Sequence, residues 1–163
     1  SPIVDPATST MRCFAENHGM DNRMGNGKQQ QDPERLPTGC SIVLCRQIIR
    51  SGEDLHIGGV LTGFTTHKFP NRIESFTIYS LLSDGFGSFE VSVEIHDVQS
   101  GTCLLTATGP VVELRDQWAA QVAPIVINGL VVDHSGRFEV VLFANGLPVG
   151  RTHFLVRHLS ESR

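Results

Sequence analysis

Seven histidines give this chain its most obvious capacity for chemistry, because a neutral imidazole binds metal ions and titrates near neutral pH. Two histidines at positions i and i+2 of a strand would share a face and could chelate a metal, but this spacing does not occur. His153 shares its strand face with Arg151 and Arg157, whose charges disfavour a cation. Four further histidines are solitary in the sequence: His56, His67, His96 and His134. We therefore expect no metal site and no cofactor.

The chain has four cysteines, of which Cys40 and Cys45 have a C-x4-C spacing. Cys13 and His18 lie upstream, so a structural zinc ion could in principle gather these four side chains. An odd separation along an extended chain, however, places Cys40 and Cys45 on opposite faces. We expect Cys45 and Cys103 to be small buried hydrophobes within their strands. Reduced structural thiols favour a cytoplasmic location.

The chain lacks the common catalytic motifs: it has no Gly-x-Ser-x-Gly elbow and no glycine-rich phosphate loop that opens a helix. Glu90 and Glu94 share a strand face, but strand rise separates them by about 13 Å, which is too far for the carboxylate pair of a glycosidase. We expect both glutamates to pair instead with Arg151 or Arg157 across strands.

The only tryptophan, Trp118, lies in the connection 115–120. A loop tryptophan either plugs the end of a domain, which is the favoured reading because it buries a large surface, or anchors a partner. With the loop aromatics Phe86 and Phe69, Trp118 is also a candidate to bind a carbohydrate or another small ligand.

Short alternating apolar runs separated by turn signals extend from about Cys40 to Leu159. They predict eight strands, over residues 41–49, 55–60 (extending with a bulge to 69), 73–82, 88–98, 102–114, 122–132, 137–144 and 148–158. Asn145-Gly146, between the last two, predicts a type I′ hairpin. Turns at intervals of roughly 8 to 12 residues predict an all-β, Ig-like antiparallel β-sandwich.

Two of the predicted strands allow their faces to be assigned. In strand 88–98 one side is apolar throughout, which predicts burial on that side: Phe89, Val91, Val93 and Ile95. Strand 137–144 is apolar on both sides, so the last hairpin is expected at a sheet centre or in an interface. The interface candidates are Val141, Phe143, Arg151 and Arg157. In strand 102–114, Gly109-Pro110 predicts two pieces or an edge strand with a bulge.

Composition argues against two classes of partner. Seventeen acidic and thirteen basic residues give a net charge of −4, and only Lys28 and Lys68 are lysines, so nucleic-acid binding is disfavoured. No apolar run approaches the roughly 18 residues that span a bilayer. The first residues carry no recognisable secretory signal. We expect neither nucleic acid nor membrane as a partner.

The chain divides by composition into three parts. Residues 1–39 have almost no apolar periodicity and are predicted to form a flexible arm, which is either a leader or a docking arm that adds a strand to a neighbouring sheet. Residues 40–159 form the predicted sandwich, and residues 160–163 form a tail.

A resemblance to a known family rests on four segments: residues 41–49, Gly58-Gly59-Val60 leading to Phe69-Pro70, residues 89–93 with Ser100-Gly101, and residues 136–140 with the Asn145-Gly146 hairpin. Here the chain, from about Cys40 to Leu159, resembles a family of small uncharacterised bacterial proteins, a domain of unknown function with an Ig-like sandwich. The resemblance implies the fold and a bacterial origin. It supplies no catalytic residues.

We expect a non-enzymatic structural or protein-interaction module, which associates with another protein or with itself as a homo-oligomer. One alternative is a ligand-binding sandwich that uses the loop aromatics. A third is an enzyme in which His96, His153 and Glu94 converge, and it requires strands 88–98 and 148–158 to be neighbours.

Overall fold

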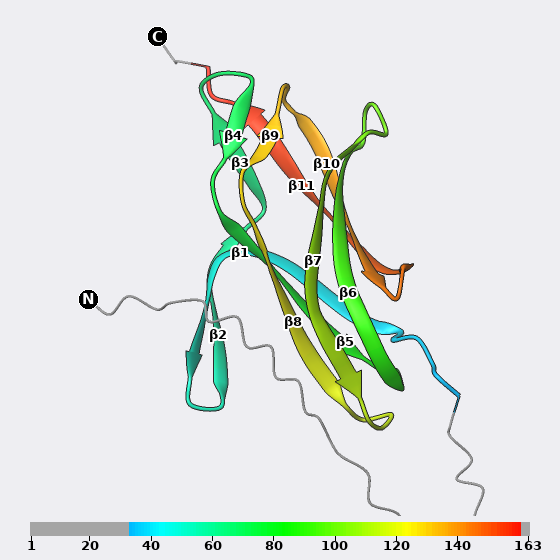
Figure 1. Ribbon diagram of the computed structural model, residues 1–163. Coiled ribbons are helices and arrows are strands. Elements are labelled where there is room, and N and C mark those ends of the chain that lie inside the picture. Colours follow the sequence, from blue (N-terminus) through cyan, green and yellow to red (C-terminus); the bar gives the residue numbers. More distant parts are fainter. Residues whose placement is uncertain (1–32, 161–163) are drawn as a thin grey trace, which may run out of the picture. The chain divides into compact units, whose positions relative to one another are not determined.

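A computed structural model of the chain describes residues 33–160, which form strands joined by turns (Figure 1). The strands are β1 (Gly39–Ser51), β2 (Asp54–Leu61), β3 (Gly63–Thr66), β4 (Asn71–Ile73), β5 (Phe76–Ser83), β6 (Gly87–Asp97), β7 (Cys103–Leu114), β8 (Ala120–Ile127), β9 (Leu130–Val132), β10 (Gly136–Ala144) and β11 (Leu147–His158). Two large sheets, in the orders β2-β1-β5-β8 and β3-β11-β10-β6-β7, enclose one core, and β4 pairs with β9. The expected all-β sandwich is confirmed. Within residues 33–160, no helix is long and apolar enough to cross a membrane.

The core lies between the two large sheets, where alternate residues of the strands are buried. On β6 the four residues with 0% exposure are the predicted ones: Phe89, Val91, Val93 and Ile95. Phe138 and Phe154, paired across β10 and β11, stack with their ring centroids 5.5 Å apart. Burying one such side chain contributes about 1.5–3 kcal/mol. Burial of the inward-facing apolar side chains of both sheets is therefore the main contribution to the stability of the fold.

The hairpin between β10 and β11 has the predicted type I′ geometry. Asn145 has a φ of 49° and Gly146 a φ of 76°, the left-handed conformation that such turns require. The Asn145 side chain also accepts the backbone N–H of Glu90 at 2.8 Å and donates to the carbonyl of Ser88 at 3.1 Å. The turn residue thereby fastens the hairpin to the start of β6.

The predicted number of eight strands is wrong, because the chain changes sheet inside regions with continuous strand character. Residues 55–69 form both β2, which pairs with β1, and β3, which pairs with β11 in the opposite sheet. A Cβ atom on Gly63 would overlap the carbonyl oxygen of Leu155, so glycine permits this close approach. Because β3 runs parallel to β11, the sandwich is not purely antiparallel.

The predicted strand 122–132 also divides in two. Gly129 has a φ of +72°, which ends β8 and redirects the chain into β9. β9 then pairs with β4, matching Leu130 with Ile73. Alternation alone did not reveal this break, because the residues on both sides of the turn are apolar and buried.

Strand β7 confirms the prediction of a bulged edge strand. It ends the order of the five-stranded sheet, and its pairing with β6 shifts register around Gly109-Pro110. A Cβ atom on Gly109 would lie 2.7 Å from Cγ1 of Ile125. Glycine therefore lets β7 approach β8 and close this side of the sandwich.

The predicted boundary at Cys40 is too late. Arg35 exchanges two backbone hydrogen bonds of 2.8 Å with Phe86, and Leu36 packs against the core. Residues 33–39 therefore belong to the sandwich. The rest of the predicted arm, residues 1–32, and the tail residues 161–163 lie outside the described range, so both readings of the arm stay predictions.

Candidate functional site

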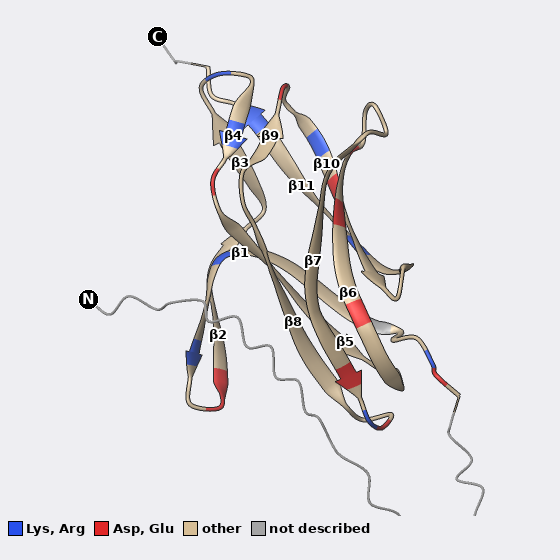
Figure 2. Ribbon diagram, in the orientation of Figure 1, with Lys and Arg blue, Asp and Glu red and all other residues tan. Residues whose placement is uncertain are grey.

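At its outward positions within the described residues, the outer face of the four-stranded sheet carries one charged side chain, Asp54 at the start of β2, and β5 and β8 are tan throughout in Figure 2. Val60 and Val126, from the two edge strands, are 63% and 56% exposed. Tyr79 and Leu81 on the central strand β5 are half-buried. We call this surface, without the Ser51–Asp54 pair at the end of the β1–β2 hairpin, the uncharged face, and its outward positions are Ser41, Val43, Cys45, Gln47, Ile49, His56, Gly58, Val60, Thr77, Tyr79, Leu81, Ser83, Ala120, Val122, Pro124 and Val126.

The outer face of the five-stranded sheet is chemically different, and we call it the charged face. Four side chains lie opposite one another across β7, β6, β10 and β11: Cys103, His96, Glu139 and His153. The neighbouring row contains Thr106, Glu94, Val141 and Arg151. Register therefore brings ionisable groups from four strands onto one surface.

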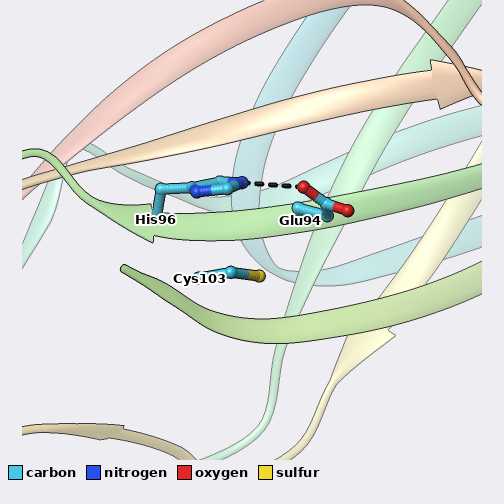
Figure 3. A group of neighbouring side chains, drawn as sticks. All are labelled: Glu94, His96 and Cys103. Atoms are coloured by element: carbon cyan, nitrogen blue, oxygen red, sulfur yellow. Dashed lines mark hydrogen bonds and ion pairs between the residues drawn. The ribbon is translucent and has the colours of Figure 1, made fainter. Parts of the chain in front are cut away.

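Glu94, His96 and Cys103 form the tightest of these groups (Figure 3). The His96 Nε2 and Glu94 Oε2 atoms are 2.8 Å apart, and one ligand atom from each of the three residues lies within 4.8 Å of the others. The sequence suggested that His96 is solitary, but the structure places it beside Glu94 and Cys103. Cys103 is exposed, so the prediction that it is buried is wrong. Its position depends on a register shift in the β6–β7 pairing, which sequence spacing does not report.

Glu139 occupies the centre of a second group on the charged face, which sequence reasoning missed. Its Oε1 atom is 3.6 Å from the Arg151 guanidinium and 3.4 Å from His153 Nε2. Arg151 therefore pairs with Glu139, and the predicted pairing of Glu90 or Glu94 with Arg151 or Arg157 is wrong. The reason is topological: β10 lies between β6 and β11, so the strands carrying His96 and His153 are not neighbours either.

The four interface candidates occupy two interior strands of this same sheet. The predicted central position of the last hairpin is confirmed, since β10 and β11 both have a partner on each side. Val141 is only 5% exposed between Glu94 and Arg151, and Phe143 is half-buried. Arg157 is exposed opposite Thr65 of β3. Their proposed role as an interface stays a prediction.

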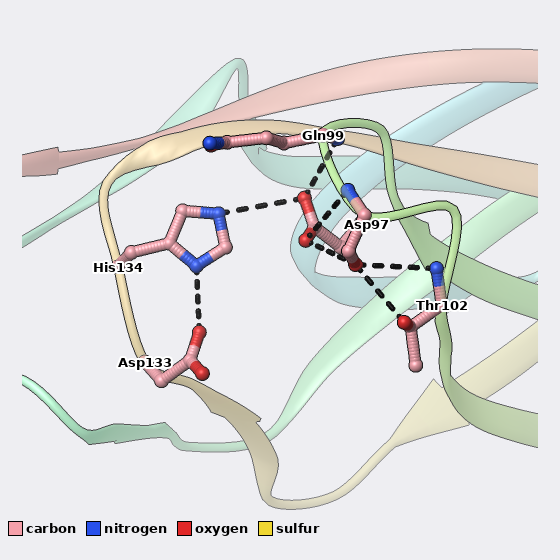
Figure 4. Close-up of polar contacts among 6 residues, drawn as sticks. Asp97, Gln99, Thr102, Asp133 and His134 are labelled. Atoms are coloured by element: carbon pink, nitrogen blue, oxygen red, sulfur yellow. Dashed lines mark hydrogen bonds and ion pairs between the residues drawn. The ribbon is translucent and has the colours of Figure 1, made fainter.

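A separate polar network joins the β6–β7 turn to the β9–β10 loop (Figure 4). Asp97, which is 4% exposed, accepts hydrogen bonds from the Ser100 hydroxyl at 2.6 Å and the Gln99 backbone at 3.0 Å. His134 donates from Nδ1 to Asp133 at 2.6 Å, and its Nε2 lies 3.4 Å from Asp97 Oδ1 without hydrogen-bond alignment. The Ser100 hydrogen bond lowers the pKa of Asp97, and the Asp133 hydrogen bond raises the pKa of His134. The network holds two loops together by charge.

The structure brings two of the three aromatic candidates together. Trp118 and Phe86 line a groove of about 630 Å³ with Arg35 and Arg115. Trp118 is 84% exposed, so the prediction that it plugs the sandwich end is wrong. Phe69 does not line this groove; its ring centroid lies 5.9 Å from that of His158.

The cysteines differ in environment. Cys45 is 0% exposed, as predicted, and its thiol donates to the Thr77 carbonyl at 3.5 Å. Burial raises the pKa of the Cys40 and Cys45 thiols. The zinc alternative also needs Cys13 and His18, which lie outside the described residues.

Comparison with known proteins gives a family and similarities to solved structures. No curated protein matches this chain. Among solved structures, the Pseudomonas fluorescens alkylpurine DNA glycosylase AlkC, bound to DNA containing an abasic site analog, matches with 20% identity and a TM-score of 0.42. That match covers 52% of this chain and 26% of the glycosylase chain, so this chain matches about a quarter of that protein. A model of a family of unknown function, DUF6941, matches residues 41–157, which begin inside β1, end inside β11 and include every strand between them. The chain belongs to the family of unknown function DUF6941.

Proposed function

We propose that this chain is a non-enzymatic protein-interaction module that pairs with a second copy of itself through the uncharged face. The observation that carries the proposal is that, among the outward positions of β1, β2, β5 and β8 within the described residues, the only charged side chain is Asp54, at the end of the β1–β2 hairpin and outside the uncharged face. Charged residues make up 18% of the chain, and several of them lie on the charged face of the same domain. A sheet face without charge loses little hydration when another surface covers it.

The choice of a second copy as partner follows from symmetry. A two-fold interface places each surface patch against the same patch of the other copy. A patch with net charge would therefore face its own sign and be repelled, whereas the uncharged face has no such penalty. A partner that recognises charge would find nothing to bind on this face.

The size of the uncharged face is also sufficient. Ordinary interfaces bury roughly 30 Å² per residue, so its outward positions offer about 500 Å² per copy. Two copies would bury about 1,000 Å², which is the lower limit for a specific interface. We therefore expect a moderately stable dimer that dissociates on dilution.

Placing a charge on the uncharged face tests the proposal. Val126→Lys and Val60→Lys should each weaken dimerisation at least about a hundredfold, because symmetry brings two lysines into one interface. Val111→Lys is the matched control: Val111 is 61% exposed on the charged face, close to the 56% of Val126 and the 63% of Val60. Sedimentation velocity over a wide concentration range, with all variants checked by thermal unfolding, gives the dissociation constants. A wild-type monomer at every concentration, or an equal effect of Val111→Lys, contradicts the proposal.

A second candidate function is carbohydrate binding at the groove beside Trp118. The supporting observation is the 84% exposure of this indole above a groove that also presents Arg35 and Phe86. An exposed indole face stacks well on a sugar ring, and the arginine could hydrogen-bond its hydroxyls. Because Trp118 is the only tryptophan, its fluorescence reports directly on this groove. Two negative results together would exclude this function. The first is no change in Trp118 fluorescence when oligosaccharides are added, and the second is no difference between wild type and Trp118→Ala in binding to a glycan array.

We also propose an Ig-like sandwich, a cytoplasmic location and a bacterial origin. Two stacked sheets support the first, and the free thiols of Cys40, Cys45 and Cys103 support the second. The bacterial origin rests on the sequence resemblance alone. Nucleic acid and membranes are not among the partners that we propose, because clustered basic residues are lacking in the sequence.

A further inference from the structure

Three different metal-ligand types meet on the charged face, at the side of the sheet where β6 and β7 pair. Glu94 and His96 are two residues apart on β6, so both project from its outer face. Cys103 begins β7 directly opposite His96. Figure 3 shows the Cys103 side chain on the strand next to the Glu94–His96 pair.

A bulge creates this meeting. In the ladder, Ile95 pairs with Leu105 but His96 pairs with Cys103, so Leu104 is an extra residue on β7. Without the extra residue, His96 would face position 104, and the thiol of Cys103 would not share the row of His96. Bulges commonly re-aim a side chain in this way. Leu104 itself is 38% exposed, so the bulge is not explained by burial of the extra side chain.

We propose that Glu94, His96 and Cys103 bind a transition-metal ion of the zinc class, with the fourth coordination position open. A thiolate, an imidazole and a carboxylate are all zinc ligands, and three protein ligands with one open position are typical of sites that take an exchangeable group. The thiolate and imidazole disfavour Mg²⁺ and Ca²⁺, which prefer oxygen ligands.

The distances are compatible with this assignment. Ligand atoms about 2.0–2.3 Å from a tetrahedral zinc ion are about 3.3–3.8 Å from one another. The three ligand atoms here lie within 4.8 Å of one another, and the shortest separation is 2.8 Å. Shifts of about an ångström in exposed or half-buried side chains therefore suffice, while the strands stay in place.

The surroundings also favour a cation. Glu139 lies opposite His96 on β10, so a second carboxylate adds negative charge beside the ligands. The Thr106 hydroxyl is 3.8 Å from the Cys103 sulfur and can support the thiolate. Arg151 is directed toward Glu139, at 3.6 Å, so its charge is already partly neutralised.

Cobalt titration of the full-length, tag-free, reduced protein tests the proposal. Co²⁺ reports on this ligand set because a Co²⁺–thiolate bond adds a near-ultraviolet charge-transfer band and a tetrahedral ion adds intense visible bands. Wild type should bind one Co²⁺ with both signals, and Zn²⁺ should displace it. Cys103→Ser should abolish the charge-transfer band. His96→Gln should weaken binding by more than about tenfold, since even loss of an outer-shell partner costs 10–100-fold.

Two controls separate this site from other thiols and imidazoles. Cys40→Ser removes a cysteine of the alternative set with Cys13, His18 and Cys45, and His153→Gln removes another histidine of the charged face. Both variants should keep the cobalt spectrum, and unchanged thermal unfolding should show that every variant is folded. Absence of stoichiometric Co²⁺ in wild type overturns the proposal. So does a charge-transfer band that survives in Cys103→Ser or disappears in Cys40→Ser.

Discussion

The two outer faces of this sandwich cover the same core but differ in chemistry. The uncharged face has no Lys, Arg, Asp or Glu at its outward positions, whereas the charged face aligns Cys103, His96, Glu139 and His153 across four strands. Burial of the inner residues cannot explain this difference, because both sheets alternate inward in the same manner. The difference is what our proposal requires, in which the uncharged face meets another protein surface and the charged face meets water and ions.

The largest expected effect compares two phenylalanines of β10 that point to opposite faces. Phe138→Ala should lower the free energy of unfolding by about 3–5 kcal/mol, because Phe138 is 0% exposed within the core. Phe143→Ala, on the half-buried charged face, should cost only about 1 kcal/mol. Urea unfolding of both variants measures the difference. Equal costs would mean that a second layer covers the charged face and would reverse the assignment of the two faces.

The next effect concerns the Asp97 network. Asp97→Asn should destabilise the fold by about 1.5–3 kcal/mol, because it removes charge-assisted hydrogen bonds between a buried carboxylate and the turn that follows it. The exposed Asp54→Asn, at the end of the β1–β2 hairpin, is the control and should change stability little. Chemical unfolding at pH 6 supplies both values. A similar loss of unfolding free energy in the two variants would show that Asp97 has no special structural role.

The same network gives the unfolding free energy a defined pH dependence. Asp97 has a folded pKa below its ordinary 3.8, so its contribution is present above that value and is lost as pH falls through the folded pKa. His134 has a folded pKa above its ordinary 6.5, so its contribution is complete below 6.5 and is lost as pH rises through the folded pKa. Stability should therefore be highest between these two windows. Asp97→Asn should reduce the loss of stability that wild type shows as the pH falls through the acid range. If that loss is unchanged in the variant, other carboxylates cause it.

A smaller effect is expected from the ionic group around Glu139. Glu139→Gln should destabilise the fold by about 0.5 kcal/mol at low salt, because Glu139 contacts Arg151 and His153 on a partly exposed surface. High salt should remove most of the difference by screening. Thermal unfolding of wild type and variant at two ionic strengths measures it. A cost above about 2 kcal/mol, independent of salt, would show that this group is buried against another molecule.

The smallest effect is expected for salt on dimerisation. If the uncharged face forms the interface, the dissociation constant should change less than about threefold between low and high ionic strength, because no charges meet there. Sedimentation at both salt concentrations measures it. A tenfold or larger weakening by salt would place the interface on the charged face instead.

The sequence predicted those features that depend on neighbouring residues. Alternation identified the buried side of β6 correctly, and Asn145-Gly146 identified the final hairpin, because both signals are local. It did not predict that the chain crosses between sheets at Thr62 or that β10 separates β6 from β11. Choice of strand partner depends on packing across the whole domain, which a short window does not contain.

The dependence on long-range strand pairing also explains which candidate sites the sequence could predict. The Glu94, His96 and Cys103 group depends on one extra residue in β7, so a one-residue difference in register would separate the thiol from the imidazole. The uncharged face, in contrast, left a readable signal. The segments 76–83 and 120–132 contain no charged residue, although the outward half of a solvent-facing strand usually carries some.

The prolines of two edge strands have a consequence for the form of any assembly. Pro110 lies in β7 and Pro124 in β8, the strands that end the two large sheets on the side where they meet. A proline offers no backbone N–H, so neither strand presents an unbroken row of donors to an incoming chain. Growth by successive strand addition is therefore hindered on this side of the molecule. The proposed pairing through the uncharged face would in contrast close on itself, because a two-fold interface leaves no free copy of the same patch for further growth.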